Sequence, residues 1–203
     1  MTTPIAALAT SDGRRHRSAR TRDALADALL DLIVEGRLRP TAKEIAERAG
    51  VSVRSVYVHF DDLEDLMCVA TARHYARIAP MLEPVPLEGS LTTRAHALVE
   101  RRIRLYARIG AVGRATQLQA PFSPTLAKVV SNAHARSRAE LERVFAPELD
   151  ALAPDTRGTA LALLDVLSGP QTWETLREVN GLSVEDAADA VVTAIIRQLA
   201  AER

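Results

Sequence analysis

The sequence predicts an all-α protein, and three observations support this expectation. Alanine, the residue with the highest helix propensity, occurs 35 times in the 203 residues. Aromatic residues, which sheets favour, make up only 3% of the chain. Apolar residues recur at spacings of three and four in most segments, and no segment alternates as a half-buried strand does.

Composition limits the class of protein. Hydrophobic residues make up 47% and charged residues 26%, which is typical of a globular chain. The longest apolar runs are five residues, whereas a membrane span needs about 20, so we expect no membrane segment. The N-terminus has no secretory pattern, and Cys68 as the only cysteine excludes an internal disulfide and a multi-cysteine zinc site. We therefore expect a cytoplasmic protein.

The net charge of zero hides an uneven distribution. The first 60 residues hold ten Lys and Arg against seven Asp and Glu, and the remainder holds sixteen against nineteen. A basic N-terminal third indicates an anionic partner for that part of the chain. A difference of this size can also arise by chance.

The first helix is expected over residues 18–35, where apolar residues such as Leu25, Leu29 and Leu32 share one face. Gly36 ends this helix, as glycine often does. Residues 1–12 show no helical period, and a basic run follows from Arg14 to Arg22. We expect residues 1–17 to form a flexible basic arm.

Three short helices should follow. Thr41, with Glu44 three residues later, fits a capping box for a helix that Gly50 ends. Ser52 can cap the next helix, residues 53–58. A fourth helix is expected to begin at Asp61 or Asp62 and to end near Pro80.

The remaining two thirds of the sequence predict further helices. A proline-rich break at residues 83–86 precedes helices expected at 91–109, 110–118, 125–145 and 155–179. The last of these is expected to be disturbed at Gly169 and Pro170. Ser183 and Asp186 form a capping signature for a final helix that runs to about residue 201.

Residues 41–57 have the geometry of a helix-turn-helix. Ala46 is small enough for a close helix crossing, Gly50 permits a left-handed turn, and Ile45, Val51 and Val56 can fill a shared core. In this motif the N-terminal residues of the second helix reach base edges in the major groove. An ordinary helical hairpin is the alternative interpretation of this spacing.

The candidate DNA-binding residues fall into two groups. Arg54 is the natural base reader, since a guanidinium binds guanine through two hydrogen bonds, and Val53 can contact a thymine methyl. Ser52 and Ser55 lie beside them, and Thr41, Tyr57 and His59 are expected to hold phosphates.

The chain also resembles the N-terminal domain of the TetR family of transcriptional regulators. The resemblance covers about residues 18–70 and rests on residues 21–25 (TRDAL), 45–52 (IAERAGVS), 56–60 (VYVHF) and 63–66 (LEDL). It implies a three-helix DNA-binding domain at residues 18–62, followed by a helical ligand-binding and dimerisation domain at 63–203. It further implies a dimeric repressor that a small molecule releases from a near-palindromic operator. An activator and a protein that acts through protein contacts remain alternatives.

One position departs from the family pattern. Many members carry a phosphate-binding lysine at the start of the fourth helix, where this chain has Asp61 and Asp62. Acidic residues suit a helix N-terminus but cannot bind phosphate. We expect the phosphate contact to move to the basic arm, with Arg17 and Arg20 as candidates; a solvated charged tail is the alternative.

The larger domain offers candidate ligand-binding residues. Arg102 and His134 each interrupt an apolar stripe of a predicted helix, and Tyr106 and Trp173 can wall a cavity between helices. Each of these four residues also has a plain packing interpretation.

The last two helices are candidates for the dimer interface. Their apolar faces can form a four-helix bundle across a two-fold axis, with packing within one chain as the alternative. The candidate interface residues are Leu161, Leu164, Val184, Ala187, Ala188, Val191, Ile195 and Leu199.

No enzymatic signature is apparent. The chain lacks a nucleophile elbow, a phosphate-binding glycine loop and a paired-histidine zinc motif. The five histidines share no metal-ligand spacing. We therefore expect no catalytic site, no cofactor and no metal, although an enzyme or a metal-binding helical protein is the competing class.

Overall fold

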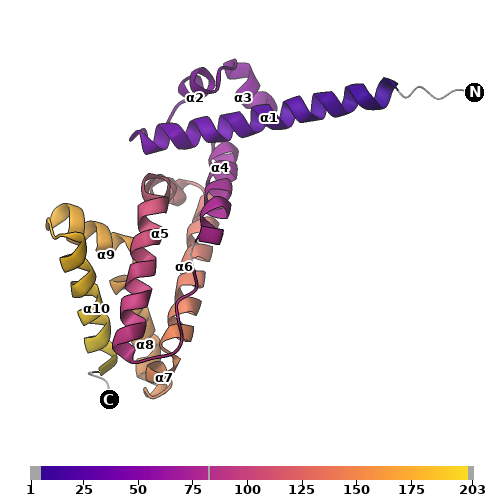
Figure 1. Ribbon diagram of the computed structural model, residues 1–203. Coiled ribbons are helices and arrows are strands. Elements are labelled where there is room, and N and C mark those ends of the chain that lie inside the picture. The colour runs from indigo at the N-terminus through magenta and orange to yellow at the C-terminus, as the bar shows by residue number, and fades with distance from the viewer. Residues whose placement is uncertain (1–5, 82, 201–203) are drawn as a thin grey trace, which may run out of the picture. The chain divides into compact units, whose positions relative to one another are not determined.

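A computed structural model describes residues 6–81 and 83–200, and every regular element in these ranges is helical (Figure 1). The prediction of an all-α fold is confirmed. The helices in chain order are α1 (Ala6–Val34), α2 (Ala42–Ala49), α3 (Val53–His59), α4 (Leu63–Ile78), η1 (Ala79–Met81), α5 (Leu91–Gln119), η2 (Ala120–Phe122), α6 (Pro124–Val144), α7 (Ala146–Leu149), α8 (Pro154–Leu167), α9 (Pro170–Glu174), η3 (Thr175–Val179) and α10 (Val184–Ala200).

The chain forms two compact units. The first unit comprises Met1–Arg77 and Ile109–Ala127, and the second comprises Ile78–Arg108 and Lys128–Arg203. Helix α5 contributes to both, and it bends at Gly110, whose backbone has φ 20° and ψ −114°. The break expected after residue 109 is therefore a kink within one helix. The domain boundaries expected after residues 17 and 62 stay a prediction.

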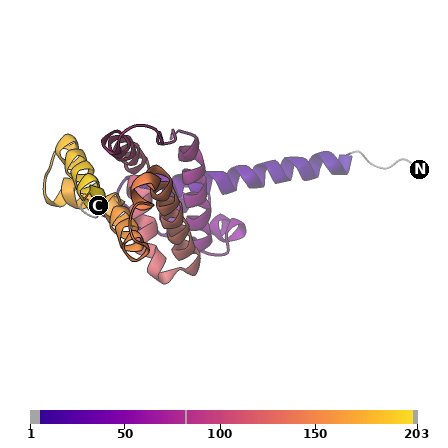
Figure 2. The same cartoon turned by 90° about the horizontal axis from the view of Figure 1, so that it is seen from below.

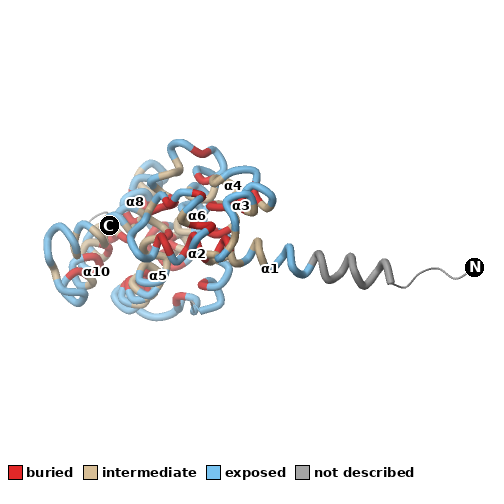
Figure 3. The backbone as a smooth tube through the Cα atoms, turned by 90° about the horizontal axis from the view of Figure 1, so that it is seen from above, coloured by how far each residue is buried: buried red, intermediate tan, exposed pale blue. Residues whose placement is uncertain are grey.

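Helix α1 begins earlier than the sequence indicated. It starts at Ala6, so most of the expected arm is helical. The described side chains at residues 16–20 are all exposed, and Figure 3 shows this stretch in pale blue. With no face to bury, these residues need no apolar period, and periodicity therefore missed the first turns of the helix.

The core of the first unit lies where α1, α2, α3 and α4 meet. The C-terminal part of α5 and the start of α6 complete it. Its fully buried side chains include Leu25, Ile33, Ile45, Val56, Leu66, Met67, Ala115 and Leu126. Cys68 packs against this core, and burial, followed by the charges of Glu64, Asp65 and Asp62, raises the pKa of its thiol.

The core of the second unit joins α5, α6, α7, α8 and α10. Helices α8 and α10 pack against each other (Figure 2). Its fully buried side chains include Leu98, Leu141, Phe145, Leu149, Leu164 and Ile195. A buried ion pair joins two of these helices, with Arg94 Nη2 at 2.6 Å from the Glu148 carboxylate.

The expected disturbance at Gly169 and Pro170 separates α8 from α9, and a short π-helix, η3, follows. Ser183 accepts a hydrogen bond from the Asp186 backbone N–H at 3.0 Å, as its predicted capping role requires. Within the described residues, no helix is both long enough and apolar enough to span a membrane.

Candidate nucleic-acid interface

Thr41 fixes the start of α2. Its hydroxyl accepts a hydrogen bond from the Glu44 backbone N–H at 3.3 Å, and the Glu44 carboxylate accepts one from the Thr41 backbone N–H at 2.8 Å. The predicted capping box is therefore present. The Thr41 backbone N–H and the Thr41 hydroxyl both donate to the Glu44 carboxylate at 2.8 Å, and these two bonds hold the pKa of that carboxyl below its ordinary value.

The turn between α2 and α3 has the predicted geometry. Gly50 is left-handed, with φ 67° and ψ 33°, and its N–H bonds to the carbonyls of Ala46 and Glu47. A Cβ at Gly50 would meet no atom within 4 Å, so backbone conformation alone favours glycine there. Ala46 is buried at the helix crossing, as the sequence indicated.

Helix α3 presents its N-terminal residues to solvent. Ser52 caps it by accepting a hydrogen bond from the Ser55 backbone N–H at 3.2 Å. Val56 is fully buried, whereas Val53 and Tyr57 are 41% and 55% exposed. Arg54 is exposed, and its side chain makes no hydrogen bond or ion pair with any described residue. The face of α3 that carries Arg54 is thus exposed to solvent, whereas the opposite face packs in the core of the first unit.

The C-terminal end of α3 is fixed by a residue that the sequence analysis placed in the basic arm. Arg22 on α1 donates a hydrogen bond to the His59 carbonyl at 2.5 Å, and its guanidinium lies 4.3 Å from the Phe60 ring centroid. Its other nitrogen is 4.0 Å from the Asp65 carboxylate. Arg22 therefore positions α3 from inside the domain, a role that no local pattern signalled.

The remaining arm candidates lie elsewhere on α1. Arg17 and Arg20 are exposed and three residues apart, so they share one face. At about 100° per residue, that face points away from Arg22 and from the end of α3 that it contacts. The structure thus brings Arg22, and not Arg17 or Arg20, to α3.

The acidic pair before α4 has a structural role. The Asp62 carboxylate accepts a hydrogen bond from the Asp65 backbone N–H at 2.8 Å and so caps α4. Asp61 and Asp62 are both exposed. Asp62 therefore stabilises the N-terminus of α4.

The family model for bacterial regulatory proteins of the tetR family matches residues 25–67, the segment that contains α2, α3 and their turn. This segment, about a fifth of the chain, therefore has the sequence of a TetR-family N-terminal region. Its DNA-binding helix-turn-helix is the capped, Gly50-centred unit described above. The match also agrees with the family that the sequence motifs indicated.

Solved structures support the fold of this chain. A transcriptional regulator from Rhodococcus sp. Rha1 superimposes with a TM-score of 0.65 at 20% identity, over 91% of this chain and 95% of that chain. A candidate transcriptional regulator from Pseudomonas aeruginosa PAO1 gives 0.62 at 18% identity, over 93% and 92%.

A candidate TetR-family regulator from Mesorhizobium loti MAFF303099 gives a TM-score of 0.58 at 20% identity, over 91% of this chain and 98% of that chain. The comparison with curated proteins finds no match. At these identities the structural likeness shows that the helical arrangement is shared over nearly the full length.

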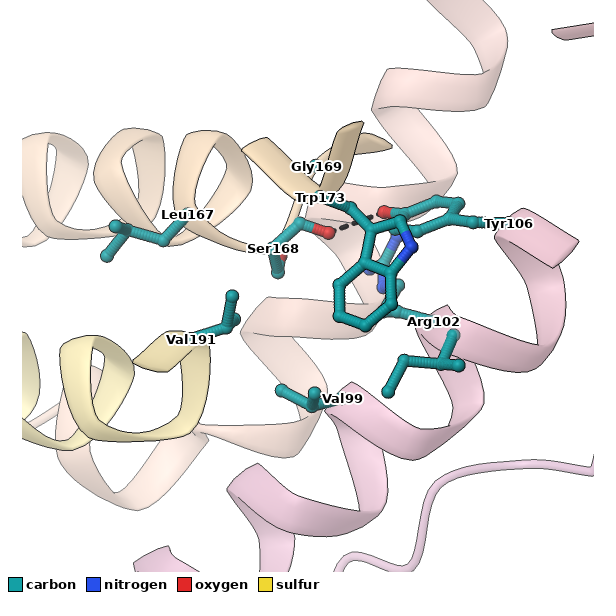
Figure 4. A pocket seen from close by; sticks show the side chains of 9 residues that line it. Val99, Arg102, Tyr106, Leu167, Ser168, Gly169, Trp173 and Val191 are labelled. Atoms are coloured by element: carbon teal, nitrogen blue, oxygen red, sulfur yellow. Dashed lines mark hydrogen bonds between the residues drawn. The ribbon is translucent and has the colours of Figure 1, made fainter. Parts of the chain in front are cut away.

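Three of the four candidate ligand-binding residues meet at one cavity in the second unit (Figure 4). The cavity is small, with a volume of about 10 Å³ that leaves room for about one water molecule, and Arg102, Tyr106 and Trp173 line it. His134 lies outside the cavity lining, half-exposed on α6, with Nδ1 at 3.3 Å from the Asp165 carboxylate. On its stripe, His134 thus lies at the surface within hydrogen-bonding distance of Asp165.

The candidate dimer residues are mostly covered by their own chain. Leu161, Leu164, Ala187, Val191, Ile195 and Leu199 are buried in the second unit, Ala188 packs against them, and Val184 is 48% exposed. Six of these side chains are therefore covered within one chain. Their place in a dimer interface stays a prediction.

The outer face of α8 is the apolar surface that this arrangement leaves open. Thr159, Ala162, Leu163 and Val166 are all exposed and spaced as one helical stripe. The corresponding stripe of α10 is polar, with Asp186, Asp189, Thr193 and Arg197. Among the described residues, no cluster of three or more His, Cys, Asp or Glu side chains can hold a metal ion.

Proposed function

We propose that this TetR-family regulator is a dimeric repressor that binds a near-palindromic operator and leaves it when a small molecule binds the second unit. In this proposal α3 enters the major groove and two copies read two half-sites. Such a regulator acts where the DNA is, in the cytoplasm.

One observation carries the proposal. Arg54 stands in the first turn of α3, exposed and unengaged by any described residue, while Val56 and Phe60 bury the other face of the helix. A guanidinium in this position can bind guanine O6 and N7 together. Val53 beside it is 41% exposed and can contact a thymine methyl.

The flanking polar groups suit phosphate contacts. Tyr57 is 55% exposed, and the Ser52 and Thr41 caps place hydroxyls at the N-termini of α3 and α2, where backbone N–H groups favour an anion. Ser55 and His59 are half-buried beside them. Arg17 and Arg20 remain candidates for contacts farther along the DNA, since α1 carries them exposed.

The dimer and the ligand response rest on features of the second unit. The exposed stripe of Leu163 and Val166 on α8 offers an apolar surface to a second copy. In this proposal a small molecule enters beside Trp173, where the present cavity holds about one water molecule and must widen. Release from DNA then requires that the ligand bind the DNA-incompetent arrangement more tightly than the competent one.

The experiment is selection of bound duplexes from a random DNA pool, followed by anisotropy titrations of the selected site at two salt concentrations. We expect one near-palindromic sequence whose affinity falls as salt rises. Arg54→Ala should cost about 1–3 kcal/mol and relax the preference at one base position per half-site. Arg104→Ala, an exposed arginine of the second unit, is the matched control.

A helix-turn-helix protein that acts through protein contacts is the second candidate, and the exposed Asp61 and Asp62 favour it. It predicts weak binding without sequence preference. If no sequence is enriched and Arg54→Ala binds as tightly as the wild type, the regulator proposal fails and this candidate replaces it.

A further inference from the structure

The segment from the end of α1 to the end of α2 carries one cation that no carboxylate balances. Three of its four Lys and Arg side chains form ion pairs at distances between 2.5 and 3.9 Å. These pairs are Arg37–Glu44, Lys43–Glu47 and Arg48–Glu35. Arg39, the fourth, is exposed and makes no ion pair with any described residue. Its charge is therefore available to an anionic partner.

The chain is held on both sides of Arg39. The Leu38 carbonyl accepts a hydrogen bond from Gln119 Nε2 at 3.2 Å, and the Leu38 side chain packs against the core of the first unit. Pro40, on the other side, is buried. A proline also restricts the backbone of the residue before it. With both neighbours anchored, Arg39 is fixed with its side chain at the surface.

Phe122 holds the Arg39 guanidinium from η2, the corner between α5 and α6. The guanidinium carbon lies 5.6 Å from the ring centroid, within the range of a cation–π interaction. The Phe122 side chain is 75% exposed and so contributes little to the core. The corner itself is anchored, because the buried Ser123 hydroxyl donates to the Glu64 carboxylate at 2.6 Å and accepts from the Leu126 N–H at 3.0 Å. An exposed ring on an anchored corner thus orients the cation.

This cation lies next to the candidate nucleic-acid interface. Arg39 precedes by two residues Thr41, which caps α2, and the whole arrangement, including Phe122, belongs to the first unit. The start of α4, where many TetR-family members carry a phosphate-binding lysine, holds Asp61 and Asp62 instead. An uncompensated cation beside α2 can supply the phosphate contact that the start of α4 lacks.

We propose that Arg39 binds a backbone phosphate of duplex DNA and that Phe122 is a positioning residue whose ring holds the guanidinium ready for this contact. The inference rests on the proposed function in that DNA is the partner. A freely rotating arginine loses side-chain entropy when it binds, and one that is already stacked loses less. A phosphate contact carries no base information, so its loss weakens binding to all sequences alike.

The test measures, by fluorescence anisotropy, how the full-length protein binds a duplex of mixed sequence at several salt concentrations. Each phosphate contact contributes about 0.9 to the slope of log affinity against log salt concentration. Arg39→Gln should therefore lower this slope by about 0.9 and weaken binding at least about threefold. Arg39→Lys keeps the charge and should keep the slope. A slope that Arg39→Gln leaves unchanged would overturn the proposal.

Arg37→Gln is the matched control. It removes the same charge two residues away, from an exposed side chain that Glu44 already engages at 2.5 Å. We expect its slope to fall by less than about half as much as that of Arg39→Gln. Equal falls would show an effect of overall charge and would overturn the assignment to Arg39. Thermal unfolding checks that each variant is folded.

Variants of Phe122 test the positioning role. Phe122→Leu removes the ring and keeps an apolar side chain, so it should weaken DNA binding about threefold, whereas Phe122→Tyr should bind as the wild type does. In a protein that already carries Arg39→Gln, Phe122→Leu should have no further effect. The same loss in both backgrounds would show that Phe122 acts independently of Arg39 and would overturn its positioning role.

The mixed-sequence duplex separates this contact from the proposed function. If selection from the random pool enriches no sequence but Arg39→Gln still lowers the salt slope, the regulator proposal fails and the phosphate contact is supported. If a sequence is enriched but Arg39→Gln changes neither slope nor affinity, the contact fails and the regulator proposal is supported. A protein that binds no duplex even at low salt overturns both.

Discussion

The two units use arginine in opposite ways. In the first, Arg54 is exposed at the start of α3 and makes no hydrogen bond or ion pair with a described residue, so its charge is available to a partner. In the second, Arg94 and Arg102 are 3% and 6% exposed; Arg94 contacts the buried Glu148 carboxylate, and Arg102 contacts the carboxylate of Glu140, which is 11% exposed. The exposed arginine can meet a partner in solution, whereas the buried ones act within their own unit.

The largest expected effect concerns the buried ion pair between Arg94 and Glu148. Arg94→Ala leaves Glu148 buried and uncompensated, and we expect a loss of about 3–5 kcal/mol in unfolding free energy. Arg77→Ala in the first unit removes an exposed ion pair with Asp27 at 2.8 Å, which should cost about 0–1 kcal/mol. Urea unfolding measures both. Equal losses would show that burial does not distinguish these arginines.

The two faces of α8 give the next test. Leu164 is fully buried, so Leu164→Ala should lower stability by about 2–5 kcal/mol and leave the oligomeric state unchanged. Leu163 is 41% exposed on the other face, so Leu163→Glu should remain folded and shift the dimer to a monomer. Light scattering after gel filtration measures the mass. A dimer that survives Leu163→Glu would place the interface elsewhere.

Replacing glycine by alanine at two positions should change the free energy of unfolding in opposite directions. Gly50 needs a left-handed backbone, so Gly50→Ala should cost about 1–2 kcal/mol even though its Cβ meets nothing. Gly158 lies within α8 with open space around it, so Gly158→Ala should add about 0.5–1 kcal/mol. Thermal unfolding provides the comparison, and a stabilising Gly50→Ala would contradict the turn geometry.

The smallest expected effect is on the stability of the folded protein at acid pH. The folded-state pKa of Glu44 is lowered by Thr41, so the folded state holds this carboxylate more strongly ionised than the unfolded state does. The ionised Glu44 carboxylate stabilises the folded state fully above its ordinary pKa of about 4.3. This stabilisation is lost as pH falls through the lower, folded-state pKa. Glu44→Gln should therefore flatten the fall in urea midpoint below about pH 5. Parallel profiles for the two proteins would refute this linkage.

The sequence predicted what local spacing determines. Caps at Thr41, Ser52 and Ser183, the turn at Gly50 and the break after residue 109 each depend on a few neighbouring residues, and the structure contains all of them. The helix-turn-helix followed from these same local signals. The placement of Arg102, Tyr106 and Trp173 at one cavity also agrees with the stripes that they occupy.

The spacing of apolar residues along the sequence does not determine which part of the protein packs against each apolar helix face. The apolar faces of α8 and α10 were predicted to meet a second chain, and in the structure these two helices also pack against each other. Arg22 looked like part of a charged arm, but a contact 37 residues away in the sequence, with the His59 carbonyl, determines its role. Long-range pairing of this kind leaves no periodic signal.

The only cysteine and the only tryptophan lie in different units, Cys68 on α4 and Trp173 on α9. An acceptor dye attached to the thiol at mildly alkaline pH would therefore make energy transfer from the indole a ruler between the two units, with no engineered label site. Titrating the labelled protein with DNA would show whether the distance between the two units changes on binding.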